Sequence, residues 1–219
     1  MVKLEQVYKH LGDFSLQDIN IELPKGYICG LIGENGAGKT TLLHLIMGLY
    51  KPAKGEIAVM GKRFTEDEAV IHDAMGVVLQ ERLFEDFMTL QENASYYGRH
   101  YSAYDEEFFL ELLARYELEP DRKYKQLSKG EELKFQFAFA LAHHPRLLIL
   151  DEPTGNFDPE FREEFLKDLK DFIADGVRSV ILATHLTEDL DRIAIILSIL
   201  RMARYCFHRI LRSFVTAID

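Results

Sequence analysis

Apolar and polar residues alternate along the start of the chain and then give way to short, nearly continuous apolar runs. Residues 2–8 and 16–23 alternate roughly, which predicts two half-buried strands joined by a turn at 11–13. The later runs predict further short strands, of which the run before Asp151 suits a buried parallel strand. These further strands are expected at residues 27–32, 56–60, 76–79, 146–150 and 179–183.

Between residues 81 and 145 the apolar residues take the three- and four-residue spacing of helices. Thr89 and Glu92 form a capping box that opens a predicted helix through residue 97. Residues 105–116 and 130–143 carry apolar side chains at the same spacing. We therefore predict a helical lobe inserted into an α/β core.

Residues 33–41 read Gly-Glu-Asn-Gly-Ala-Gly-Lys-Thr-Thr, between an apolar run and a helical pattern. This is the arrangement of a phosphate-binding P-loop, in which glycines let backbone N–H groups approach an anion. The following helix directs its positive end at the same anion. Lys39 can reach the β- and γ-phosphates, and the Thr40 hydroxyl can take a Mg²⁺ position. An ordinary glycine-rich turn is the alternative, and the full motif favours a nucleoside triphosphate site.

A second acidic motif follows the run 147–150, where the chain reads Asp151-Glu152. The run resembles a Walker B strand, in which Asp151 would hold Mg²⁺ through water. Glu152 is placed to polarise an attacking water molecule. The alternative is a simple acidic turn after a strand, which a P-loop in the same chain disfavours.

Composition narrows the classes of partner. The chain has 219 residues, of which 47% are hydrophobic, and a formal net charge of −10, so a nucleic-acid backbone is an unfavourable partner. Cys29 and Cys206 have no metal-like spacing, which fits a reducing cytoplasm. No secretory leader is visible, and the longest apolar run, 193–200, is too short to span a bilayer. Any membrane role is expected to go through a partner.

With Leu-Ser-Lys-Gly-Glu at 127–131, the chain resembles an ATP-binding cassette ATPase, the motor subunit of ABC transporters, over about residues 2–194. Gln80, the D-loop at 155–158 and His185 follow the family order, although Gln80 alone could be a solvated strand end and His185 an ordinary loop histidine. The resemblance implies an α/β fold: a P-loop NTPase core with an antiparallel β subdomain and an inserted α-helical subdomain. The expected parts are a core at 1–80 and 146–194, the helical signature lobe at 81–145 and an atypical tail at 195–219.

The resemblance also implies a mechanism. Two cassettes pack head to tail around two ATP molecules, and the Ser128 region of one faces the γ-phosphate held by the other. Glu152 would orient water, His185 would contact the γ-phosphate, and Gln80 would bridge Mg²⁺ and the helical lobe. The implied nucleotide-binding residues are Gly33, Asn35, Gly36, Gly38, Lys39, Thr40, Thr41, Gln80, Ser128, Gly130 and Asp158. The implied catalytic residues are Lys39, Glu152 and His185, and the implied metal ligands are Thr40, Gln80 and Asp151.

Two departures from the family pattern leave roles open. Lys129 and Glu131 replace a glycine and a glutamine of the usual signature, in a form that resembles a branch of bacterial exporter cassettes. Glu131 either closes a capping box with Ser128 or contacts a ribose. The family's adenine-stacking aromatic is replaced by Leu11, and either Tyr8 or Phe14 could substitute for it.

The leading interpretation is an ATPase subunit that drives a separate membrane permease, with export preferred over import, at the inner face of the cell membrane. The alternatives are a cassette ATPase that acts on ribosomes or DNA and a non-hydrolysing regulatory cassette. The acidic charge disfavours the first alternative, and the retained Lys39, Asp151, Glu152 and His185 disfavour the second. The family docks its permease just after the Q-loop glutamine, so residues 81–101 are expected to form an interface. Apolar surface there would come from Phe84, Phe87, Met88, Tyr96 and Tyr97, which could equally be the core of the lobe.

The tail, residues 195–219, does not follow the cassette pattern, because the family's next strand pair is missing. It carries four arginines against Asp219 and contains no lysine. One interpretation is a basic amphipathic helix on a membrane surface or partner. The preferred interpretation is a frameshift. Codons can be chosen so that one restored guanine after the Ala194 codon gives a strand, an Asp-Gly turn and a return strand.

Overall fold

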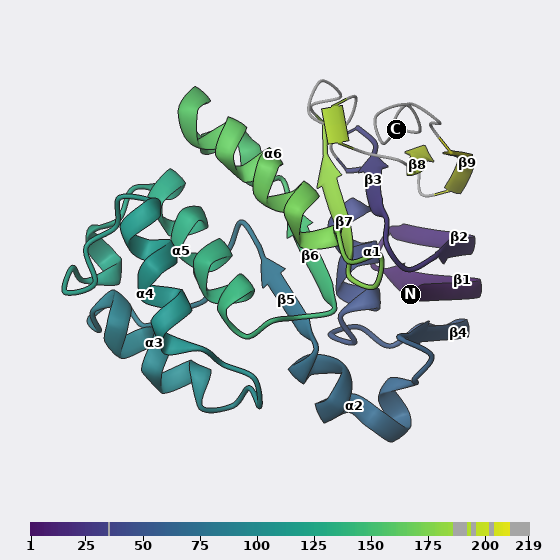
Figure 1. The fold of residues 1–219 in the computed structure, drawn as a ribbon. Helices are drawn as coiled ribbons and strands as arrows, with labels where there is room; N and C mark the ends of the chain where they lie inside the picture. The colour runs from purple at the N-terminus through teal and green to yellow at the C-terminus, as the bar shows by residue number, and fades with distance from the viewer. Residues whose placement is uncertain (35, 186–191, 194–195, 202–203, 211–219) are drawn as a thin grey trace.

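The computed structural model describes residues 1–34, 36–185, 192–193, 196–201 and 204–210. In this part of the chain nine strands form one mixed sheet, in the order β4-β1-β2-β9-β8-β3-β7-β6-β5 (Figure 1). The strands are β1 (Val2–Leu11), β2 (Phe14–Leu23), β3 (Ile28–Ile32), β4 (Lys54–Val59), β5 (Met75–Val78), β6 (Leu147–Asp151), β7 (Ser179–Thr184), β8 (Ile196–Arg201) and β9 (Arg204–Ile210). The helices are α1 (Lys39–Ile46), α2 (Phe64–Asp73), α3 (Leu90–Gly98), α4 (Glu106–Arg115), α5 (Lys129–Ala142) and α6 (Pro159–Ile173), with the short 3-10 helices η1 (Tyr124–Gln126) and η2 (Pro153–Asn156).

Strands β3, β7, β6 and β5 lie side by side and run parallel. Every residue of β6 is buried. Leu148 and Leu150 pack into the cluster under α5 and α6, and Leu147 and Ile149 pack into the cluster around α1. Both faces of the strand are therefore covered, which explains its unbroken apolar sequence.

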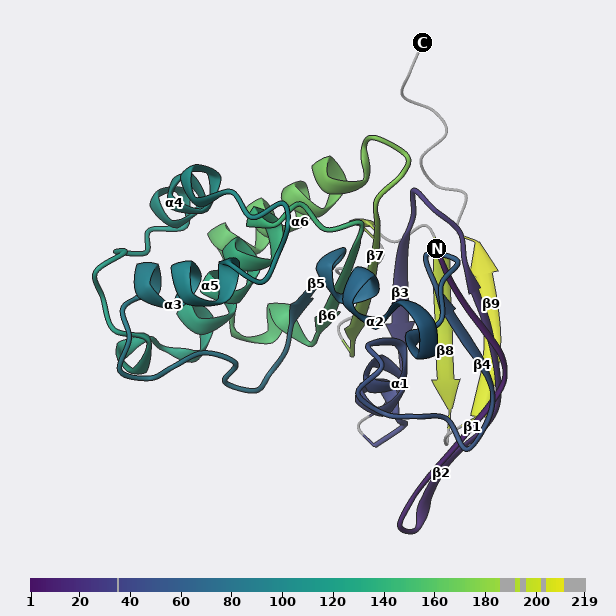
Figure 2. The same cartoon turned by 90° about the horizontal axis from the view of Figure 1, so that it is seen from below.

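The antiparallel part of the sheet pairs β1 with β2 and with β4. Its inward residues, such as Val2 and Leu4, join Leu42 and Ile46 of α1 in one core cluster. Helix α1 thus lies between this part of the sheet and the parallel strands (Figure 2). The predicted α/β fold, with an antiparallel β subdomain beside a P-loop core, is confirmed.

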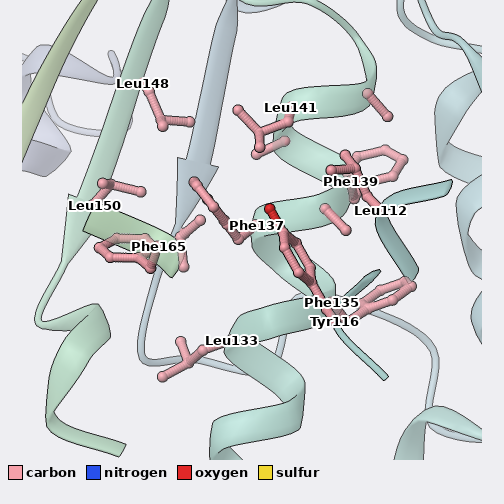
Figure 3. Close-up of a cluster of buried hydrophobic side chains, with 14 of the residues drawn as sticks. Leu112, Tyr116, Leu133, Phe135, Phe137, Phe139, Leu141, Leu148, Leu150 and Phe165 are labelled. Atoms are coloured by element: carbon pink, nitrogen blue, oxygen red, sulfur yellow. The ribbon is translucent and has the colours of Figure 1, made fainter. Parts of the chain in front are cut away.

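The helical lobe consists of α3, α4, η1 and α5, all within residues 81–145. Its core is aromatic: Phe135, Phe137 and Phe139 of α5 pack with Tyr116 and with Phe165 of α6 (Figure 3). Thr89 caps α3 with the predicted capping box to Glu92. The inserted helical lobe is therefore present, while the exact domain bounds stay a prediction.

A buried polar contact joins the lobe to the core. The Tyr116 hydroxyl donates to Asp168 Oδ2 at 2.6 Å, and Arg115 Nη2 donates to the same oxygen at 2.6 Å. Burial raises the pKa of the Asp168 carboxyl, and these two donors oppose that rise. The contact fixes α4 against α6.

Helix α2 was not predicted from the sequence. Asp67 interrupts it with non-helical backbone angles of φ −132° and ψ 30°, and Ile71 is its buried residue. Because the helix is kinked and buries so little, it has no regular apolar stripe to detect.

The tail interpretation needs correction for residues 196–201 and 204–210. They form the antiparallel pair β8–β9 instead of a helix, and β8 pairs in parallel with β3. The terminal strand pair that we expected to be missing is therefore present. Strand β8 pairs with the edge of β3 that β7 leaves open, and an open strand edge readily accepts another strand. Ala194, Ile195 and residues 211–219 lie outside the described residues, and the frameshift interpretation stays a prediction. No helix in the described part of the chain is long and apolar enough to span a bilayer.

Candidate nucleotide-binding site

The carboxyl end of β3 leads through the glycine loop into α1, which begins at Lys39. Gly38 has φ 101°, and a Cβ atom there would lie 2.6 Å from the Phe14 ring, so only glycine fits. A cleft of about 410 Å³ opens at this loop. Its lining residues are Leu11, Phe14, Glu34, Gly36, Gly38, Lys39, Thr40, Thr41, Asp151 and Glu152.

Lys39 is the buried cation of this cleft, at 6% exposure. Its Nζ donates to the Gly33 carbonyl oxygen at 2.7 Å and lies 3.3 Å from Glu152 Oε1. The ammonium is therefore held at the junction of the P-loop and the end of β6. A buried ammonium at this position is suited to bind a phosphate.

Thr40 and Asp151 meet beside Lys39. The Thr40 hydroxyl donates to Asp151 Oδ2 at 2.8 Å, and Asp151 Oδ1 is buried with no hydrogen-bond partner among the described residues. Burial is the main reason that the pKa of Asp151 is raised, and the Thr40 hydrogen bond opposes it. An orphaned carboxylate oxygen next to a hydroxyl is a fitting oxygen pair for Mg²⁺.

In the described residues no three His, Cys, Asp or Glu side chains cluster in a way that could hold a metal ion by themselves. Mg²⁺ commonly binds through one or two carboxylates, water and substrate phosphates, so the Thr40–Asp151 pair agrees with that mode. Gln80 lies at the same turn, because its Nε2 donates to the Glu152 carbonyl oxygen at 2.6 Å.

Glu152 follows β6 in a left-handed conformation, with φ 50° and ψ 42°. Non-glycine residues rarely adopt this conformation, and it persists only where the surroundings hold it. Here the Glu152 amide donates to the Ala183 carbonyl at 2.8 Å, and Oε2 lies 2.6 Å from His185 Nδ1. The Glu152 carboxylate is thus oriented by Ala183 of β7 and by His185, the residue that follows β7.

The structure brings most of the predicted site residues to one place. Those at or next to the cleft are Gly33, Gly36, Gly38, Lys39, Thr40, Thr41, Gln80, Asp151, Glu152 and His185. Asn35 lies outside the described residues. Ser128, Gly130 and Asp158 are not among the described residues that line the cleft.

These three residues have structural partners of their own. Ser128 caps α5, and a Cβ atom on Gly130 would lie 2.6 Å from the Asn156 carbonyl oxygen. Asp158 caps α6 and lies 3.2 Å from Lys134 Nζ. The hydrogen bond from the Phe161 amide is the main reason that the pKa of Asp158 is lowered. These contacts explain the three residues within one chain.

The sequence did not single out Glu34, which lines the cleft, or the contacts of Lys129 and Lys134. Glu34 is the second residue of the glycine motif, and this position is the one sequence signal that could have predicted its place at the cleft. Of the two candidate adenine-stacking residues, Phe14 lines the cleft, and Tyr8 is not among the described residues that do. Lys134 and Lys129 contact residues far away in sequence, which no local pattern indicates.

A family model described as ABC transporter matches residues 16–155. The chain is 35% identical over 198 residues to the Nod factor export ATP-binding protein I of Sinorhizobium fredii, covering 88% of this chain and 57% of that protein. It is 32% identical over 215 residues to the nucleoside import ATP-binding protein NupA of Lactococcus lactis subsp. cremoris, covering 93% of this chain and 42% of that protein. The chain therefore spans about half the length of these two relatives.

A solved structure of similar length supports the same relationship. It is the dimeric post-hydrolysis state of the ATP-binding cassette MJ0796 bound to ADP and Pi. It has a TM-score of 0.87 and 27% sequence identity, and the match covers 98% of this chain and 100% of that one. Motif order, cleft and comparisons agree: the chain belongs to the ABC transporter family, among its ATP-binding cassettes.

Proposed function

We propose that this chain is the motor subunit of an ABC transporter, which binds and hydrolyses ATP and drives a separate membrane permease. The observation that carries the proposal is the meeting of Lys39, Asp151 and Glu152 in one cleft at the start of α1. A cation, a metal-binding carboxylate and a second, oriented carboxylate are the groups that phosphoryl transfer to water requires.

The residues divide the chemistry as follows. Lys39 and the P-loop amides bind the β- and γ-phosphates. Thr40, Asp151 and Gln80 would hold Mg²⁺, which when bound would neutralise phosphate charge. Glu152 polarises the attacking water, and its link to His185 keeps the carboxylate in position. His185 then stabilises the charge that develops on the γ-phosphate.

A second cassette completes each site in this proposal. Ser128, Gly130 and Asp158 lie away from their own cleft, and Ser128 starts α5, whose first turn offers a positive helix end. A partner packed head to tail would bring that helix end to the γ-phosphate of the opposite cleft. Binding of two ATP molecules then closes the pair, and hydrolysis reopens it.

The permease is proposed to dock on a groove of about 350 Å³ between α2 and the helical lobe. Phe84, Tyr97 and Tyr101 contribute to its lining. The subunit would then sit at the inner, cytoplasmic face of the cell membrane, bound through its permease. Export is the preferred direction because of the Ser-Lys-Gly signature, and the net charge of −10 disfavours nucleic acid as a partner.

The test compares the wild-type chain with Lys39→Ala and Glu152→Gln. The wild type should hydrolyse MgATP, and Lys39→Ala should lose about 10²-fold in ATP affinity because a buried charge-assisted contact is gone. Glu152→Gln should bind ATP normally, hydrolyse it at least about 10²-fold more slowly and elute as a dimer in ATP.

The matched control is Glu111→Gln, which removes an exposed carboxylate of α4. It should behave as the wild type in all three measurements. Wild-type turnover by Glu152→Gln would show that Glu152 is not the catalytic carboxylate. A wild type that neither binds nor hydrolyses ATP would overturn the proposal as a whole.

A further inference from the structure

Helix α5 turns one polar face toward the segment that carries Gln80. Gln136, buried at 1% exposure, spans the backbone on both sides of Gln80. Its Oε1 accepts from the Leu79 amide at 2.8 Å, and its Nε2 donates to the Glu81 carbonyl oxygen at 3.0 Å. Two backbone groups around Gln80 are therefore fixed to α5.

Lys129 makes the contact to Gln80 itself. Its Nζ donates to the Gln80 carbonyl oxygen and lies 3.3 Å from Glu132 Oε2. Glu132, at 5% exposure, also accepts from Arg82 Nε at 2.7 Å. The buried carboxylate thus has a cation on each side, which offsets its desolvation.

Lys129, Glu132 and Gln136 stand at positions i, i+3 and i+7 of α5, so they lie on one face of the helix. The usual family signature has glycine at position 129, which offers no side chain for such a contact. The Lys129 contact to Gln80 is therefore a feature of this chain's own signature.

The other side of Gln80 is tied to the catalytic turn. Its Nε2 donates to the Glu152 carbonyl oxygen at 2.6 Å, while its own carbonyl accepts from Lys129. One residue thus connects the turn after β6 to the first turn of α5. Ser128 caps that same turn.

We propose that Lys129 is a positioning residue that holds the first turn of α5 against Gln80. Ser128, which caps that turn, would then move together with Gln80. The inference rests on the proposed function, in which Ser128 serves the ATP site of the partner cassette. A change at the catalytic turn is passed through Gln80 and Lys129 to Ser128. Lys129 therefore acts through Gln80.

The experiment uses the full chain and three variants. Lys129→Met keeps the length of the side chain but removes the donor, Lys129→Arg restores a donor, and Lys167→Met removes an exposed lysine of α6 as the matched control. Amide hydrogen exchange of residues 79–84 is measured without nucleotide. Binding of a fluorescent ADP and steady-state MgATP hydrolysis are measured on the same proteins.

Lys129→Met should speed exchange of residues 79–84 by at least about five-fold, because one of their anchors is lost. Its kcat should fall about five-fold or more, with affinity for the fluorescent ADP unchanged within about two-fold. Lys129→Arg should restore exchange and kcat to within about two-fold of the wild type. Lys167→Met should match the wild type throughout.

Unchanged exchange of residues 79–84 in Lys129→Met would overturn the inference, with or without a loss of kcat. In that case a loss of kcat would point to a direct contact of Lys129 with the partner's ATP, which does not require an anchor on residues 79–84. Failure of Lys129→Arg to restore exchange would overturn it too. If the wild type and Lys167→Met hydrolyse no MgATP, the proposed function fails, while the exchange measurement still decides whether Lys129 anchors Gln80.

Discussion

At the scale of single residues, close packing dictates two of the glycines in the motifs. A side chain at Gly38 would collide with Phe14, and one at Gly130 would collide with the Asn156 carbonyl oxygen. Gly130 therefore lets the first turn of α5 approach η2 within the same chain. This contact explains the retained glycine without reference to a partner's nucleotide.

Phe14 is the residue that we expect to stack on the adenine base. It lines the cleft, whereas Tyr8 is not among the described residues that do. Phe14→Ala should weaken ATP binding by about 5- to 30-fold, since base–aromatic stacking contributes about 1–2 kcal/mol. The affinity is measured by titration with ATP, and Tyr8→Ala serves as the control. If Tyr8→Ala were the weaker binder, the assignment would move to Tyr8.

At the scale of elements, Glu131 of α5 takes part both in the capping box of its own helix and in an ion pair with Arg122, which lies outside the helix. Ser128 and Glu131 form a reciprocal capping box at the start of the helix. Glu131 also lies 2.5 Å from Arg122, and this ion pair is the main reason that the pKa of Glu131 falls to about 2. These contacts support the capping role for Glu131 over a ribose contact.

The lowered pKa of Glu131 predicts a pH-dependent contribution to stability. Because the folded-state value lies below the ordinary 4.5, the contribution is present above pH 4.5 and is lost as the pH falls toward 2. Glu131→Gln keeps the cap but loses the ion pair, so at pH 7 it should be less stable by about 0.5–1 kcal/mol, the range of solvent-screened pairs. Urea unfolding at several pH values measures the difference.

The partner variant Arg122→Gln is the matched comparison, because it removes the same ion pair from the other side. Both variants should approach the wild type in stability near pH 2. A difference between Glu131→Gln and the wild type that stays constant from pH 7 to pH 2 would contradict the ion-pair explanation.

At the scale of the whole molecule, the apolar residues after Gln80 divide between core and surface. Phe84 packs edge-on against Tyr97, Phe135 and Phe139, so it belongs largely to the lobe. Phe87 is 74% exposed, with Lys125 Nζ 4.5 Å from its ring centroid. An exposed phenylalanine in the segment after Gln80 is a candidate contact for a partner.

A photo-reactive phenylalanine analogue at position 87 should therefore cross-link to the permease in membranes that contain the assembled transporter. The same analogue at Val177, an exposed apolar residue of the turn between α6 and β7, is the control and should give no adduct. Adducts are detected by gel shift and mass spectrometry. Equal cross-linking at both positions, or none at Phe87, would count against docking at this surface.

The sequence by itself was sufficient to predict the glycine loop between a strand and a helix, and the capping box that opens α3. The reciprocal capping contacts of Thr89 and Glu92 join residues three positions apart. Their hydrogen bonds form within one turn of chain, so the local sequence carries the information. The buried strands were also predictable, because burial on both faces requires apolar residues throughout.

Only the tertiary structure decided which distant residues meet. The contact of Lys129 with Gln80 spans 49 positions, and that of Tyr116 with Asp168 spans 52. The place of Phe14 at the cleft and the pairing of β8 with β3 depend in the same way on how the sheet is assembled. The local sequence limits which contacts a side chain can make, but the packing of the whole chain selects among them. The reason is that the free energy of burial depends on how the entire core packs, and not on any one segment.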